Sequence, residues 1–187
     1  MSKDIIKNKK GFSLIETLIA VSILMIAIAG PLSLVQAGLF SSIHQRNQVT
    51  ATYLAQEALE YVKNVRDTNS YSQYTASPVT WLTGLSACLG SSGCYVDPHG
   101  TLTGGNFYIK AADLVPMPLN QVLTGTVYSY SYAVGTPTTY TRVVKITPVP
   151  VGNPASDEIT VSVTVGWNDN LLARSYTVSE NIYNYEQ

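Results

Sequence analysis

The feature that most constrains this chain is an almost uninterrupted apolar run near the N-terminus, FSLIETLIAVSILMIAIAG at residues 12–30. It contains a single charged residue, Glu16. At about 1.5 Å per residue, a helix of this length spans close to 30 Å, which is the thickness of a bilayer core. The segment ahead of the run is basic, with Lys3, Lys7, Lys9 and Lys10 against Asp4. The pattern predicts a membrane helix whose basic flank marks the cytoplasmic side.

Glu16 needs a partner if it lies inside a membrane helix. An acidic side chain costs about 2.5–3.5 kcal/mol at the bilayer centre and less near a helix end. No basic residue lies between Phe12 and Phe40, so the helix itself provides no counter-charge. We therefore expect the partner to come from outside this helix.

Two other interpretations of the apolar run remain open at this point. It could be a conventional secretory signal peptide cleaved after Ala29, because Ala27, Ile28 and Ala29 follow the small-x-small pattern of a cleavage site. It could also be an uncleaved single-pass anchor. Glu16 argues against the signal peptide. In the anchor interpretation, Glu16 adds something that an anchor alone does not account for.

The stretch KKGFSLIETLIAVSIL, residues 9–24, resembles the prepilin N-terminal motif of type IV pilins and secretion-system pseudopilins. A basic leader, a glycine, an aromatic residue, an acid at the fifth mature position and an apolar run coincide in it. The resemblance implies that a membrane aspartic peptidase, the prepilin peptidase, cuts after Gly11 on the cytoplasmic side. It also implies that Phe12 becomes the N-methylated first residue and that Glu16 acts in assembly.

The resemblance also supplies the missing counter-charge. Cleavage creates an α-amino group on Phe12, which can pair with Glu16 of a neighbouring subunit. At roughly 4 Å and an effective dielectric constant near 20, the attraction is about 4 kcal/mol before desolvation. The implied partners are other pilin subunits, the prepilin peptidase and the inner-membrane assembly machinery. The implied location is the membrane before assembly and a cell-surface filament afterwards.

Beyond the membrane run, the sequence predicts one long helix over residues 12–66, with its membrane and assembly half at 12–40. Pro31 removes a backbone donor and clashes with the carbonyl of Ala27, so we expect a kink or local melting there. The alternative, that Pro31 ends the membrane helix, remains open. Downstream, apolar residues recur at steps of three and four, which indicates an amphipathic helix; these residues are Ala51, Leu54, Ala55, Ala58, Tyr61, Val62 and Val65.

The remainder of the chain is rich in Ser, Thr, Tyr, Gly and Pro and reads as a β-rich head. Alternating patterns predict strands at residues 126–134, 138–147, 159–167 and 172–178, of which the last two form a hairpin. Residues 68–120 read as an irregular connection with a short strand near 107–109.

A sheet with one apolar face needs a cover, and the stripe at residues 51–65 is the only apolar helical face that can provide it. We therefore expect an α+β, pilin-like fold with the long helix packed on an antiparallel sheet. The expected divisions are a leader at 1–11, the helix at 12–66 and the head at 67–187.

Cys88 and Cys94 are the two cysteines of the chain and lie in the stretch CLGSSGC. If the head is exported, we expect them to form a disulfide, which would stabilise the fold by roughly 2 kcal/mol in the chain-entropy model. Two unpaired thiols remain the alternative. A metal site is disfavoured because no further ligand lies at zinc spacing.

The sequence offers few ingredients for catalysis, and we expect no active site, cofactor or metal. His44 and His99 are the two histidines, with His99 in a DPHG turn, and we expect solvated or turn roles for them. The acids Asp97, Asp113, Asp157, Glu158 and Asp169 occupy scattered loop-like positions. No nucleophile-elbow, zincin or P-loop spacing occurs, and no Lys/Arg cluster after the leader indicates nucleic-acid binding.

The sequence thus predicts a structural subunit, a minor pilin or pseudopilin of a type IV pilus-like or type II secretion-like filament. The irregular middle of the head favours a minor subunit. The rival hypotheses are a secreted or membrane-anchored binding or adhesion module, released by signal peptidase after Ala29, and a membrane-anchored enzyme. Tyr-rich strands would provide the adhesive face, or they are ordinary core and surface. Motility, DNA uptake, adhesion and secretion share the same leader, so the sequence does not separate them.

Overall fold

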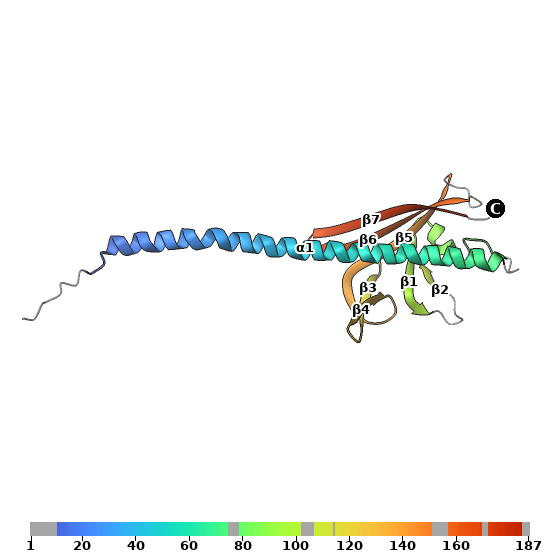
Figure 1. Cartoon of the computed structure of the whole chain (residues 1–187), viewed down its shortest axis with the longest axis horizontal. Helices are drawn as coiled ribbons and strands as arrows, with labels where there is room; N and C mark the ends of the chain where they lie inside the picture. Colours follow the sequence, from blue (N-terminus) through green and yellow to red (C-terminus); the bar gives the residue numbers. More distant parts are fainter. Residues whose placement is uncertain are drawn as a thin grey trace, which may run out of the picture. The chain divides into compact units, whose positions relative to one another are not determined.

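The computed structural model describes residues 11–74, 79–101, 107–113, 115–150, 157–169 and 172–184. The first element is helix α1, Leu14–Tyr74 (Figure 1). The 3-10 helix η1, Ser86–Leu89, follows it. Seven strands follow: β1 Cys94–Thr101, β2 Phe107–Ala111, β3 Pro118–Thr124, β4 Val127–Ser131, β5 Thr136–Val149, β6 Glu158–Asp169 and β7 Leu172–Tyr183. The chain divides into two compact units, Met1–Gln45 and Arg46–Gln187.

Helix α1 begins at a capped N-terminus. The Oγ of Ser13 accepts a hydrogen bond from the backbone N–H of Glu16 at 3.3 Å. The carbonyl of Ser13 accepts from the N–H groups of Glu16 and Thr17. Serine at the cap with glutamate three residues later is the sequence signature of a capping box, so the start of the helix is encoded locally.

Pro31 lies inside α1, and the residues on both sides of it are helical. The helix therefore neither melts nor ends at Pro31, contrary to the expected local melting. A proline removes a single donor from the helical ladder, and the neighbouring turns keep their own hydrogen bonds. The expected kink remains a prediction.

The helix continues to Tyr74, beyond the predicted end at residue 66. Thr68 and Ser72 donate their hydroxyls to the carbonyls of Asn64 and Thr68, at 2.8 and 2.9 Å. Asn69 is buried, and its amide donates to the carbonyls of Trp81 and Thr83. The polar composition looked like a loop, but these contacts hold the segment in the helix.

The sheet is antiparallel throughout and is organised around β5. One side of β5 pairs with β6 from Thr141 to Val149, and β6 pairs with β7. The other side of β5 pairs with β3 and with the start of β1, while β3–β4 and β1–β2 form the remaining pairs. All four strands predicted between residues 126 and 178 are confirmed as β4, β5, β6 and β7.

Residues 68–120 are more regular than expected. They contain the strands β1, β2 and β3 as well as η1, and β2 includes the short strand predicted near residues 107–109. The DPHG stretch, read as a turn, lies on β1, so His99 is a strand residue. Proline is tolerated there because Pro98 lies where the pairing of β1 with β2 shifts register, between Asp97 and Thr101. The paired position between β1 and β5, Cys94 with Val144, is away from Pro98.

The core of the unit Arg46–Gln187 lies between α1 and the sheet. The helical stripe is buried at Ala51, Leu54, Ala55, Ala58, Leu59, Val62 and Val65. Alternate residues of β6 are buried against it, namely Ile159, Val161, Val163, Val165 and Trp167. Figure 1 shows β5, β6 and β7 running beside this part of α1. The predicted α+β, helix-on-sheet fold is confirmed.

Candidate functional site

The expected processing junction lies just ahead of α1. Gly11 and Phe12 are exposed and non-helical, and 77% of the surface of Phe12 is accessible. A Cβ added at Gly11 would meet no atom within 4 Å. Nothing within the described part of the chain requires a glycine at this position.

Glu16 lies in the first turn of α1, next to the cap formed by Ser13. Unpaired N–H groups at a helix N-terminus favour a nearby negative charge. The Glu16 side chain is exposed and forms no ion pair with another described residue. Its carboxylate is therefore available to a positive group from outside the chain.

The helical surface after Glu16 is apolar and uncovered. Among the described residues, α1 is the one helix whose length and composition suit a membrane crossing, and a signal sequence would pass the same test. Large apolar side chains from Phe12 to Ile43 are exposed on all sides; they include Ile15, Leu18, Ile19, Ile23, Leu24, Met25, Ile26, Ile28, Leu32, Leu34, Val35, Leu39 and Phe40. A helix that is apolar all round requires lipid or other helices around it.

In the head, Arg142 is an anchor that the sequence analysis missed. It lies on β5, is fully buried, and donates from Nη1 to the carbonyl of Leu54 and to Oε2 of Glu57, at 3.0 and 2.5 Å. Its Nη2 donates to the carbonyl of Val96 at 2.7 Å. One side chain thus connects α1, β1 and β5. A signal was available in the sequence, because Arg142 falls on the inward-facing side of the alternating pattern, between Tyr140 and Val144.

Asp97 is a second missed residue, because it was read as a loop acid. It is a fully buried residue of β1, and its Oδ2 accepts from Ser131 Oγ at 2.7 Å and from the Tyr132 N–H at 2.8 Å. Its Oδ1 accepts from the N–H of His99. The carboxylate therefore connects β1 to the end of β4.

Tyr132 extends this network by donating its hydroxyl to the carbonyl of Arg142 at 2.6 Å. Burial raises the pKa of Tyr132, because the phenolate would lose its hydration, and the nearby Arg142 only partly offsets this effect. The tyrosine remains a neutral hydrogen-bond donor at physiological pH.

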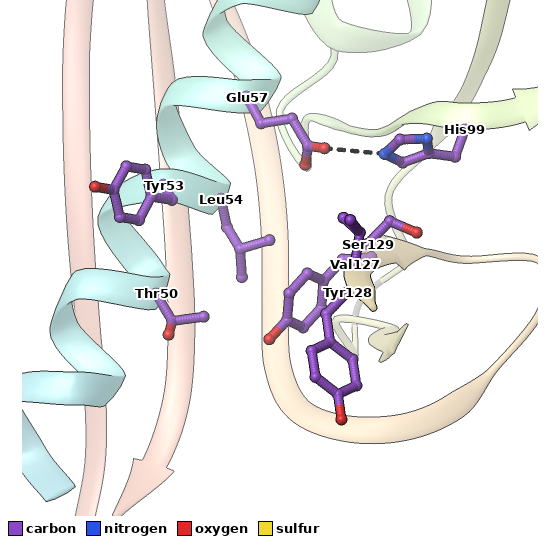
Figure 2. Close-up of a pocket in the computed structure, with 9 residues that line it drawn as sticks. Thr50, Tyr53, Leu54, Glu57, His99, Val127, Tyr128 and Ser129 are labelled. Atoms are coloured by element: carbon purple, nitrogen blue, oxygen red, sulfur yellow. Dashed lines mark ion pairs between the residues drawn. The ribbon is translucent and has the colours of Figure 1, made fainter. Parts of the chain in front are cut away.

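A hollow of about 540 Å³ lies between α1, β1 and β4 (Figure 2). Leu54 and Glu57 of α1 line one side, and Val127 to Tyr130 of β4 line the other. Nε2 of His99 lies 3.3 Å from Oε1 of Glu57 at one end of the hollow. Glu57 is already held by Arg142, so its carboxylate serves as a structural link. No group of three or more His, Cys, Asp or Glu among the described residues could hold a metal ion.

The tyrosines of the head are divided between core and surface. Tyr95, Tyr132 and Tyr140 are buried, and Tyr95 packs against Tyr132 with ring centroids 5.1 Å apart. Tyr128 is exposed. The strand tyrosines whose burial the structure describes are therefore shared between the core and the surface.

Cys88 and Cys94 are joined by a disulfide bond and are fully buried. The bond connects η1 to the start of β1. Gly93 makes the approach of this loop to β5 possible, since its φ is 75° and an added Cβ would lie 2.5 Å from the carbonyl oxygen of Val144.

Comparison with protein families finds the prokaryotic N-terminal methylation motif at residues 6–30. Neither the curated proteins nor the solved structures contain a match to this chain. The chain therefore carries the signature of type IV prepilins and pseudopilins, and its helix-on-sheet layout is pilin-like. Gly11, Phe12 and Glu16 lie within the matched residues. The signature is that of a structural family and fits a membrane-anchored precursor.

Proposed function

We propose that this chain is a structural subunit, a minor pilin or pseudopilin, of a type IV pilus-like or type II secretion-like filament. In this proposal prepilin peptidase cuts after Gly11, Phe12 is N-methylated, and residues 12–40 pack with other subunits. Cleavage would separate the leader at 1–11, and the mature chain would begin with the assembly half of the helix at 12–40. The rest of α1, which ends at Tyr74 and not at residue 66, belongs to the head. The mature subunit leaves the membrane and is displayed in the filament at the cell surface.

The observation that carries the proposal is the uncovered apolar surface that accompanies the methylation motif. An anchor needs about 20 apolar residues to cross a bilayer, and exposed large apolar side chains here continue to Phe40 and Ile43. At about 25 cal/mol per Å² of apolar area, burying this surface between helices is a large driving force outside lipid. The surface suits both a membrane and a bundle of helices from the same or from other pilin subunits.

Gly11 supports the proposed cleavage because the fold itself gives no reason for a glycine at this position. The residue has an ordinary backbone conformation, and nothing would obstruct a Cβ there. A requirement for glycine at this position would therefore come from the peptidase that has to accommodate the chain.

Glu16 gives the assembly its direction. The new ammonium on Phe12 and the Glu16 carboxylate both lie at the N-terminal end of the helix, so their pairing between neighbours fixes the axial offset of adjacent subunits. The pair is attractive in a low-dielectric bundle and weak in water. A leucine in place of Glu16 would retain apolar packing but remove this preference for one offset.

A structural role is also supported by the groups nearest to catalytic chemistry in the head. Glu57 is engaged by Arg142 and His99, and Asp97 accepts three hydrogen bonds from its own chain. These contacts stabilise the fold, so both carboxylates already have a structural role.

The proposal is tested by the incorporation of Glu16→Leu into filaments sheared from cells. We expect membrane insertion to be unchanged and the amount in sheared filaments to fall about tenfold, which corresponds to about 1.4 kcal/mol of lost pairing. Thr17→Leu is the matched control, because the Thr17 hydroxyl only donates to Leu14 of its own helix. Equal incorporation of the Glu16 variant and the control would overturn the pairing.

A further inference from the structure

The strand β7 leaves the longest free edge of the sheet. It pairs with β6 from Glu158–Tyr183 to Asp169–Leu172 without a register shift, and no described strand pairs with its other side. A long edge of this kind is a template for another strand. Sheets usually protect such edges with proline, bulges or charges, and β7 contains neither a proline nor a bulge.

We propose that β7 is a self-association surface that pairs antiparallel with β7 of a second copy about a two-fold axis at Thr177. A two-fold axis normal to the sheet keeps each side chain on its own face, so it must lie between the two strands, midway between one residue and its symmetry mate. An axis at Thr177 pairs residue 172 with residue 182 of the partner. Nearly the whole strand is then paired.

Charge selects this register. The axis at Thr177 sets Arg174 opposite Glu180 of the other copy, and the symmetry makes this pair twice. Opposite charges directly across two strands attract, whereas like charges would protect the edge. An axis one residue further along, at Val178, would set Arg174 opposite Ile182 and lose both pairs.

Both charged side chains are accessible for this contact. Arg174 is exposed, and no described residue accepts a hydrogen bond from its guanidinium. Oε1 of Glu180 lies 3.0 Å from Nζ of Lys63, and 43% of the Glu180 side chain remains exposed. In the pair, Glu180 would lie between Lys63 of its own chain and Arg174 of the other copy.

The outer face of the sheet is also self-complementary. Ser162 and Ser179 are hydrogen-bonded across β6 and β7 at 2.8 Å, and Thr164 and Thr177 at 3.0 Å. The proposed register sets Ser179 opposite Ser175 of the second copy and Thr177 opposite its own symmetry mate. Each row of hydroxyls therefore continues across the axis.

The inner face gains apolar contact from the same register. Tyr176 and Val178 are both half-buried and face the core side of the sheet. The axis at Thr177 sets Tyr176 of each copy opposite Val178 of the other copy. This pairing removes apolar surface from water.

The two-fold axis reverses the direction of every element that packs on the sheet. The joined copies therefore run in opposite directions, unlike neighbours packed through residues 12–40 of one filament. The contact goes beyond the proposed assembly and requires neither cleavage after Gly11 nor Glu16.

Disulfide trapping of Thr177→Cys in the full-length chain, purified in detergent, tests the contact. Residues opposite each other across an antiparallel pair have Cα atoms about 4.5–5.5 Å apart, within the range that a disulfide can bridge. Thr164→Cys is the matched control, because the two copies of residue 164 would lie three strand spacings apart, about 14 Å. The two natural cysteines are bonded to each other, so the introduced thiol is the one that reacts.

We expect Thr177→Cys to give a covalent dimer under mild oxidation and Thr164→Cys to give none. In the Thr177→Cys background, Arg174→Glu should reduce the dimer about fivefold, because two attractive pairs become repulsive. Adding Glu180→Arg should restore it, with thermal unfolding used to verify that loss of the Lys63 pair leaves the head folded. Equal yields from Thr177→Cys and Thr164→Cys would overturn the pairing, and an unchanged yield with Arg174→Glu would overturn the register.

Discussion

Arg142 shows how one buried charge can hold three elements together. Its guanidinium is fully buried and is compensated by Glu57 and by the carbonyls of Leu54 and Val96. The desolvation of such a pair offsets much of its attraction, so the intact pair adds little net stability. Removal of Arg142, however, leaves Glu57 without its arginine and takes the donor away from two buried carbonyls.

We therefore predict that Arg142→Met lowers the free energy of unfolding of the head by about 3–5 kcal/mol, as measured by urea denaturation. Arg174→Met is the control, since Arg174 is exposed and its loss should cost at most about 0.5 kcal/mol. Similar midpoints for the two variants would show that Arg142 does not anchor the head.

Tyr132 gives the head a dependence on alkaline pH. Its pKa is raised in the folded state, so above about pH 10 the unfolded chain loses its phenolic proton while the folded chain retains it. The free energy of unfolding should therefore be unaffected by this group below pH 10 and should decrease as the pH rises above that value. Tyr132→Phe should make this decrease shallower, whereas Tyr128→Phe, at an exposed position, should leave it unchanged. An equal slope in the wild type and Tyr132→Phe would contradict the assignment.

At the scale of elements, the sequence predicted those whose pattern is set by local periodicity. The alternation in β6 and the helical stripe at residues 51–65 each report one buried face, and both were predicted correctly. Residues 67–74 and β1 were missed because long-range contacts determine them: Asn69 binds the carbonyls of Trp81 and Thr83, and Asp97 binds Ser131. Arg142 was missed because its partners are distant in sequence.

The disulfide connects η1 to β1 and closes a short loop. We predict that Cys88→Ala/Cys94→Ala lowers the free energy of unfolding of the head by roughly 2 kcal/mol without a change in fold, because only a small loop entropy is released and no polar group is buried. In chemical denaturation, a reductant should lower the free energy of unfolding of the wild type by the same amount. It should have no effect on the double variant. If the reductant also destabilised the double variant, the loss of stability would not come from this disulfide.

At the scale of the whole molecule, the two units differ in how they treat their apolar side chains: one unit buries them and the other exposes them to solvent. The unit Arg46–Gln187 has its own core, whereas the large apolar side chains of the unit Met1–Gln45 are exposed along its helical part. Monomeric soluble proteins rarely expose an apolar surface of this extent. The N-terminal unit therefore requires lipid or other helices around it, and the methylation motif at residues 6–30 covers the start of this unit.

The most direct test is the mass of the mature N-terminus. It is measured on protein that is expressed together with a prepilin peptidase and recovered from the membrane. The account predicts a chain that begins with N-methylated Phe12, and a full-length precursor when the peptidase is left out. A mature chain that begins at Gly30, or one that keeps Met1 in the presence of an active peptidase, would contradict it.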